Sequence, residues 1–124
     1  MNFLNKLYFV EAESLTADGS TYEVRMNPQH EIYAAHFPGD PITPGVCILQ
    51  MGLELLCKLF FSRLELVQVK NVKFLNILRP DGSKVFVKIH NVVEEEDKLK
   101  AQVDLRTKDQ VVAKMSLICQ KTAK

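Results

Sequence analysis

One continuous apolar segment most constrains how this chain of 124 residues can fold. Apolar side chains recur on almost every side of a predicted helix that runs from Gly45 to about Arg63: Val46, Ile48, Leu49, Met51, Leu53, Leu55, Leu56, Leu59, Phe60 and Phe61. A helix that is apolar all round is buried on most sides and does not lie on a surface. Gln50, Glu54 and Lys58 interrupt the apolar run, so we do not expect it to span a membrane.

The residues before this helix form a proline-rich loop from Asn27 to Thr43. Thr43 is expected to cap the helix, and Pro44 to occupy its first position, where the missing N–H group would be unpaired anyway. Four prolines are predicted to preclude a regular helix or a central strand in this region: Pro28, Pro38, Pro41 and Pro44. Long loops are uncommon in compact domains and tend to be functional, so we expect a functional site here.

The other segments alternate between apolar and polar residues, as half-buried strands do. Residues 8–12 and 22–26 flank Asp18-Gly19, which predicts a hairpin with a type I′ turn, because both turn positions require positive φ. The apolar positions expected to face inward in this hairpin are Tyr8, Val10, Ala12, Tyr22, Val24 and Met26. Four more strands follow the helix, and a change of phase near Asn71 in the first of them predicts a β-bulge.

The order of elements is therefore two strands, one long buried helix and four strands. A helix that is apolar on all sides needs a layer that wraps it, and a curved antiparallel sheet with one covered face does so. We expect an α+β fold with a sheet around one central helix. The length fits a single domain over residues 1–124.

Composition excludes several classes of function. The net charge of +1 does not indicate binding to nucleic acid or to a membrane. Residues 1–62 carry 3 basic and 7 acidic side chains, whereas residues 63–124 carry 13 and 8. The basic half fits either an acidic partner or lysines on the solvent faces of strands. The three cysteines include no Cys-x-x-Cys pair, so we expect buried thiols and no metal site. The N-terminus lacks the pattern of a signal peptide, so we expect a cytoplasmic protein.

Chemistry is concentrated where the loop meets the helix. His36 lies on a proline-stiffened loop, eight residues before the expected helix start. The first turn of a helix offers free N–H groups and partial positive charge to a developing oxyanion, and Gly45 allows a ligand carbonyl to approach closely. An imidazole beside such an oxyanion hole can remove a proton next to a carbonyl. The alternative for His36 is a structural, hydrogen-bonded histidine.

The string His36-Phe37-Pro38-Gly39-Asp40-Pro41, followed after two residues by Pro44-Gly45-Val46, resembles the active-site segment of the 3-hydroxyacyl-[acyl carrier protein] dehydratases of bacterial fatty acid synthesis. That family has the hotdog fold. The resemblance implies that His36 is the base at C2 of an acyl thioester and that the N–H group of Gly45 holds the thioester oxygen. It implies that Phe37, Pro44 and Val46 line the acyl tunnel.

The same resemblance implies an acyl group carried on the phosphopantetheine arm of an acidic acyl carrier protein, and a reaction without metal or redox cofactor. It also implies a homodimer, or a trimer of dimers, in which the site lies at the dimer interface. His36 would then come from one subunit and the helix carboxylate from the other.

One departure concerns the helix. The family has Glu or Asp fourteen residues after the histidine and Gln four residues later, whereas this chain has Gln50 and then Glu54. Three interpretations stay open: Glu54 replaces the acid, His36 acts alone while Gln50 orients the hydroxyl, or the site binds acyl thioesters and dehydrates them poorly. A structural alternative for Glu54 is a helix salt bridge to Lys58.

The sequence thus predicts dehydration of 3-hydroxyacyl thioesters to trans-2-enoyl thioesters in fatty acid or specialised lipid biosynthesis. The alternatives are an acyl thioesterase and a non-catalytic hotdog protein that binds acyl groups or a carrier protein. His30 and His90 are weaker candidates for a base, because neither lies in the motif.

Overall fold

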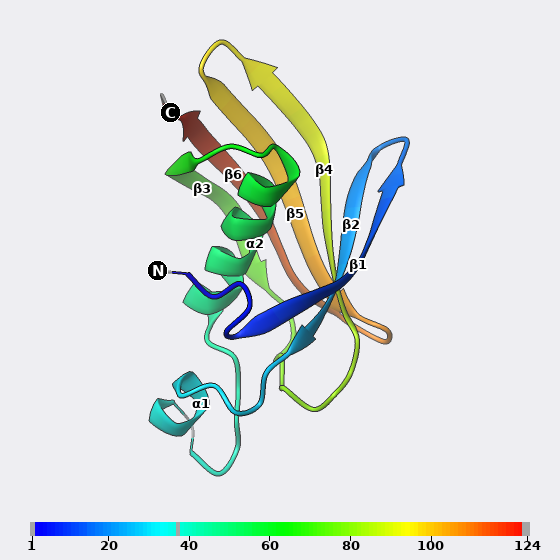
Figure 1. Ribbon diagram of the computed structural model, residues 1–124, viewed down its shortest axis with the longest axis vertical. Helices are drawn as coiled ribbons and strands as arrows, with labels where there is room; N and C mark the ends of the chain where they lie inside the picture. Colours follow the sequence, from blue (N-terminus) through cyan, green and yellow to red (C-terminus); the bar gives the residue numbers. More distant parts are fainter. Residues whose placement is uncertain (1, 37, 123–124) are drawn as a thin grey trace.

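The computed structural model describes residues 2–36 and 38–122. Six strands form one antiparallel sheet in the order β1-β2-β4-β5-β6-β3, and a long helix lies against its concave side (Figure 1). The elements are β1 (Tyr8–Thr16), β2 (Gly19–Met26), α1 (Ile32–Ala35), α2 (Gly45–Leu59), β3 (Leu64–Phe74), β4 (Val85–Glu95), β5 (Lys98–Thr107) and β6 (Val111–Lys121). The predicted curved sheet around one central helix is confirmed.

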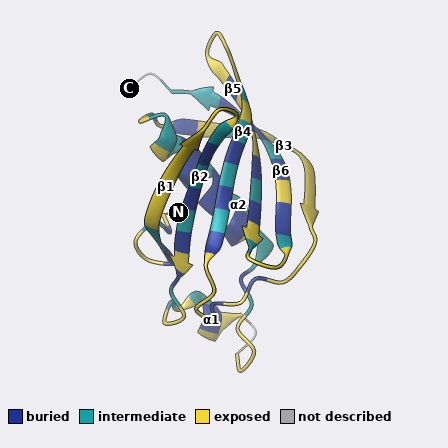
Figure 2. Cartoon of the chain, turned by 90° about the vertical axis from the view of Figure 1, so that its right-hand side faces the viewer, coloured by how far each residue is buried: buried dark blue, intermediate teal, exposed yellow. Residues whose placement is uncertain are grey.

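The alternation read from the sequence matches the burial of the sheet, which changes from residue to residue along the central strands (Figure 2). The inward residues of β4, β5 and β6 form the core with α2: Val85, Val87, Ile89, Leu99, Ala101, Val103, Leu105, Ala113, Met115, Leu117 and Cys119. In the first hairpin Tyr8, Tyr22, Val24 and Met26 are buried as expected, but Ala12 is exposed. β1 shifts register between Val10 and Ala12, which turns its far half away from the core.

The helix starts at Gly45, one residue after the expected first position at Pro44, and ends at Leu59, before the expected end near Arg63. Pro44 is the N-cap residue, and Thr43 does not cap, because its hydroxyl is hydrogen-bonded to Tyr33 instead. At the other end Phe61 has φ of +48°, and the N–H groups of Phe61 and Ser62 donate to Lys58 and Cys57. This is a Schellman motif, which usually places glycine at the position of Phe61. Within the described residues no helix is long and apolar enough to cross a membrane.

The proline-rich loop contains a helical turn that the sequence analysis excluded. α1 spans Ile32–Ala35, between Pro28 and Pro38. A proline prevents helix at its own position and disfavours it at the residue before, so the nine residues between Pro28 and Pro38 leave room for one turn. The prediction of a wholly irregular loop was therefore wrong.

The first hairpin is confirmed, but its predicted turn is wrong. Ala17 and Asp18 form the turn, and neither Asp18 nor Gly19 has positive φ. Gly19 instead begins β2 opposite His90 of β4, where an added Cβ would lie 2.1 Å from the carbonyl oxygen of Ile89. This glycine serves the close approach of two strands, which is a non-local requirement.

The predicted bulge in β3 is confirmed. The register of β3 against β6 shifts between Lys70 and Lys73, and Asn71 has φ of +52°. β3 and β1 are the two edge strands of the sheet.

The expectation of buried thiols holds for Cys47 and Cys119, while Cys57 is half-buried. Burial, with a contribution from the neighbouring Cys57, raises the pKa of the Cys119 thiol to about 11. A buried thiol with a raised pKa is inert and packs as a small apolar side chain.

Candidate functional site

His36 ends the short helix α1. It is the C-cap residue, its backbone N–H donates to Ile32 at 2.9 Å, and its side chain is exposed. The imidazole forms no hydrogen bond or ion pair with any residue that the structure describes. α1 lies at the end of the molecule where α2 begins (Figure 1).

Three tertiary contacts hold the loop between His36 and α2. Asp40 accepts hydrogen bonds from Nε and Nη2 of Arg79 at 3.1 and 3.3 Å. The N–H of Thr43 donates to the carbonyl of Leu78 at 2.8 Å, and its hydroxyl lies 2.8 Å from that of Tyr33. The segment after β3 therefore braces the loop, and nothing local in the sequence points to these partners.

The first turn of α2 is open at its backbone. Its earliest internal bonds come from Cys47 and Ile48, which donate to Pro44, so the N–H groups of Gly45 and Val46 have no acceptor among the described residues. Free N–H groups at a helix N-terminus favour negative charge. Pro44 and Gly45 are half-buried, and Val46 is 65% exposed.

Gly45 also has a packing role that the sequence did not reveal. A Cβ at this position would lie 2.9 Å from Cζ of Phe74. The ring of Phe74 therefore covers the Cα side of Gly45, and a larger residue at this position would require the half-exposed ring to move. Phe74 itself is half exposed at the end of β3.

Gln50 and Glu54 lie side by side on α2, as their spacing predicts. Nε2 of Gln50 donates to Oε2 of Glu54 at 3.0 Å. The same carboxylate accepts bonds from the N–H groups of Phe3 at 2.7 Å and Leu4 at 2.8 Å, and from the hydroxyl of Tyr8 at 2.9 Å. Burial and the neighbouring carboxylate raise the pKa of that hydroxyl well above its usual value.

Glu54 is thus bound to the N-terminal segment. The structure describes both Glu54 and Lys58, and they form no ion pair with each other. The suggested helix salt bridge is therefore not observed. Sequence spacing could show that Gln50 and Glu54 are neighbours, but the N-terminal donors are about fifty positions away in the chain.

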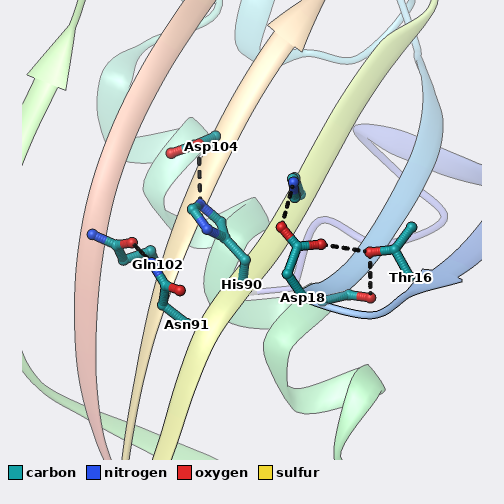
Figure 3. A network of polar contacts seen from close by, with 8 residues as sticks. Thr16, Asp18, His90, Asn91, Gln102 and Asp104 are labelled. Carbon is teal, nitrogen blue, oxygen red and sulfur yellow. Dashed lines mark hydrogen bonds and ion pairs between the residues drawn. The ribbon is translucent and has the colours of Figure 1, made fainter.

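The remaining candidates are Phe37, His30 and His90. Phe37 lies outside the described residues, and the two histidines have structural partners. His90 is on the outer face of the sheet, where Nε2 lies 3.1 Å from Oδ2 of Asp104 on the next strand (Figure 3). His30 accepts a hydrogen bond from the N–H of Ile32 through Nδ1 at 3.0 Å, which gives it a structural role near α1.

Comparison with known sequences identifies one family. The model of the ApeI-like family, which is described as ApeI dehydratase, matches residues 12–116. This range includes the whole segment from His36 to Val46, Gln50 and Glu54. No curated protein matches the chain.

Solved structures share the fold. A chain of the dehydratase heterocomplex ApeI:P from Xenorhabdus doucetiae superposes with a TM-score of 0.72 at 21% identity, covering 90% of this chain and 96% of that one. A hypothetical thioesterase from Streptococcus pneumoniae, solved with coenzyme A, gives 0.69 at 9% identity and covers 98% and 93%. A hexameric thioesterase from Yersinia pestis gives 0.53 at 15% identity and covers 69% and 75%. The expected hotdog fold is confirmed.

Proposed function

Because this chain belongs to the ApeI-like dehydratase family, we propose that it removes water from 3-hydroxyacyl thioesters and releases trans-2-enoyl thioesters. The observation that carries this proposal is the segment between α1 and α2. It joins an exposed imidazole without a hydrogen-bond partner in the described chain, at His36, to the free N–H of Gly45 at a helix N-terminus. We place the reaction in fatty acid or specialised lipid biosynthesis in the cytoplasm.

The proposed reaction is redox-neutral and uses one proton twice. The N–H of Gly45 donates to the thioester oxygen and stabilises the negative charge that develops on it. His36 takes a proton from C2, the C2–C3 double bond forms, and the C3–O bond breaks. His36 returns the same proton to the departing hydroxyl, which leaves as water.

Gln50 has an orienting role in this scheme, because an amide cannot transfer a proton at neutral pH. Glu54 already accepts four hydrogen bonds, which supports the interpretation in which His36 acts alone. Pro44, Val46 and Phe37 would then lie along the acyl chain near the reacting carbons.

We further propose that two copies associate along β3 and that the site is completed there. β3 is an edge strand with exposed apolar residues on and just after it: Val67, Val72, Phe74, Leu75 and Ile77. The other edge strand, β1, carries Glu11 and Glu13, and charged side chains on an edge strand oppose its pairing with another chain. Association in related folds, the ApeI:P heterocomplex and the hexameric thioesterase, supports an oligomer.

The carrier in this proposal is an acidic acyl carrier protein that presents the substrate on its phosphopantetheine arm. Exposed lysines on the sheet, including Lys100 and Lys114, fit an acidic partner. The coenzyme A of the pneumococcal thioesterase has the same arm chemistry in a chain of the same fold, so coenzyme A thioesters are suitable test substrates.

The wild-type protein is expected to convert a 3-hydroxyacyl thioester to the trans-2-enoyl thioester without releasing free thiol. Mass spectrometry detects the loss of water, and a thiol reagent detects hydrolysis. Release of thiol with no enoyl product would identify a thioesterase. Tight binding without either product would identify a binding protein, and both results would contradict the proposal.

Introducing a charge on the β3 edge is expected to dissociate the oligomer and to abolish dehydration. Val67→Lys places an ammonium group on the β3 edge, where the second copy is proposed to associate. Desolvation of this charge opposes association. Light scattering measures the molar mass. Leu15→Lys is the matched control, because Leu15 is exposed on the opposite edge strand. Equal masses for Val67→Lys and the wild type would contradict this interface.

A further inference from the structure

We propose that the N-terminal segment Phe3–Tyr8 is a positioning element of the site, which holds both Gln50 and the loop that carries His36. It joins them through Glu54 on one side and through His30 and Asn27 on the other. This inference rests on the proposed dehydration for its catalytic consequence. In a symmetric dimer each copy of the segment holds one His36 loop and one Gln50, so both sites depend on it.

The first link runs from the segment to α2. The carboxylate of Glu54 accepts hydrogen bonds from the N–H groups of Phe3 and Leu4 and from the hydroxyl of Tyr8, at donor–acceptor distances of 2.7 to 2.9 Å. The segment turns tightly here, because the N–H of Leu7 donates to the carbonyl of Phe3 at 2.7 Å. A carboxylate can only accept, and its two oxygens have room for all of these donors. Charge-assisted bonds of this kind are about twice as strong as neutral ones.

The second link runs from Glu54 to Gln50. Because Nε2 of Gln50 donates to Glu54, the planar amide of Gln50 is held in one orientation, with Oε1 on the side away from Glu54. In the proposed reaction this held amide is the group that orients the substrate's 3-hydroxyl. The carboxylate at position 54 therefore acts on the substrate through Gln50 and does not need to touch it.

The third link runs from the segment to α1. The ring of Phe3 meets the ring of His30 edge-on, with centroids 5.8 Å apart. His30 accepts from the N–H of Ile32 at 3.0 Å, which orders the first residue of α1. The carbonyl of Ile32 in turn accepts from the N–H of His36 at 2.9 Å. A single helical turn is unstable alone, so these contacts keep it formed.

The fourth link closes the base of the same loop. The side chain of Asn27 donates to the carbonyl of Lys6 at 2.7 Å, and its N–H donates to the carbonyl of Leu7 at 2.7 Å. The loop is thus attached to the segment at its start, through Asn27, and near α1, through His30. Loss of these contacts would let His36 move while the core stays folded. A misplacement of about 1 Å costs roughly 100-fold in rate.

Two variants test the segment, and a third serves as a control. Tyr8→Phe removes one donor to Glu54, and Phe3→Leu removes the ring contact to His30 but keeps the backbone bonds. Tyr22→Phe is matched to Tyr8→Phe, because Tyr22 is also buried and its hydroxyl is hydrogen-bonded to a carboxylate. That carboxylate belongs to Glu13 on β1, outside the segment. All three are expected to lower the free energy of unfolding by similar amounts.

The two segment variants are expected to lower kcat by roughly 10-fold with KM within about twofold of wild type, because positioning acts on the reacting geometry. Tyr22→Phe is expected to keep the wild-type kcat. A kcat that is unchanged in Tyr8→Phe and Phe3→Leu, or that falls equally in Tyr22→Phe, would overturn the inference.

Amide hydrogen exchange supplies a readout without substrate. The N–H groups of Ile32 and His36 are expected to exchange roughly 10-fold faster in Tyr8→Phe and Phe3→Leu and at the wild-type rate in Tyr22→Phe. If the wild type forms no enoyl thioester, the proposed function is wrong, while this exchange pattern still decides whether the segment holds the loop. Unchanged exchange at both amides would overturn the inference even in an active enzyme.

Discussion

Replacing His36 with alanine is expected to lower the rate of enoyl thioester formation by about 10²–10⁴-fold, the usual contribution of a general acid–base group. In the proposed mechanism this imidazole both takes the C2 proton and returns it to the hydroxyl. Gln50 has no proton to transfer at neutral pH, and Glu54 is occupied by the N-terminal segment. Neither Gln50 nor Glu54 could therefore take over the two proton transfers.

The stability of His36→Ala should stay close to that of the wild type. The side chain is exposed, and the bond that His36 makes to Ile32 uses its backbone N–H, which alanine retains. His90→Ala is the control for general effects of histidine loss, since His90 lies on the outer face of the sheet (Figure 3). Turnover measured by mass spectrometry should be lost only in His36→Ala, and turnover at the wild-type rate in that variant would exclude His36 as the base.

Gly19→Ala is expected to lower the free energy of unfolding by about 3 kcal/mol, at the upper end of the cost of overpacking. The new Cβ would lie 2.1 Å from the carbonyl oxygen of Ile89 and 3.0 Å from Cα of His90. Both atoms belong to the backbone of β4, so no side-chain rotation relieves the contact. Either β2 moves away from β4 or their hydrogen bonds at this end of the ladder are lost.

Gly52→Ala is the matched control within the same chain. Its Cβ would meet only side chains, Cγ1 of Val103 at 3.3 Å and Sδ of Met115 at 3.6 Å, and the methionine can adjust. Alanine also gains up to about 1 kcal/mol over glycine inside a helix, which offsets the crowding. Denaturant unfolding should show a large loss for Gly19→Ala and little change for Gly52→Ala. Equal losses would contradict the backbone contact as the cause.

Much of the fold follows from local patterns. The period of two in β4, β5 and β6 predicted which residues are buried, and the change of phase at Asn71 predicted the bulge in β3. The apolar run starting at Gly45 predicted the central helix. These predictions hold because a side chain's direction depends on its position in its own strand or helix, which the neighbouring residues reveal.

Other features depended on contacts between distant segments. The Schellman motif was missed because glycine, not phenylalanine, usually occupies the position of Phe61. The helical turn α1 was missed because it fits between two prolines that were expected to exclude helix. Gly19 was assigned to a turn, although its neighbour across the sheet is what requires a glycine. Apart from that of proline, local propensities are worth about 1 kcal/mol or less per residue, so tertiary contacts override them.

The candidate site divides in the same way. The sequence by itself determined the order of elements, the resemblance of the segment from His36 to Val46 to a dehydratase motif, and the exchange of acid and amide at Gln50 and Glu54. Only the tertiary structure decided what Glu54 binds, because its donors come from the N-terminal segment. Hydrogen bonds between residues fifty positions apart depend on how the chain packs, and no spacing within a helix can reveal them.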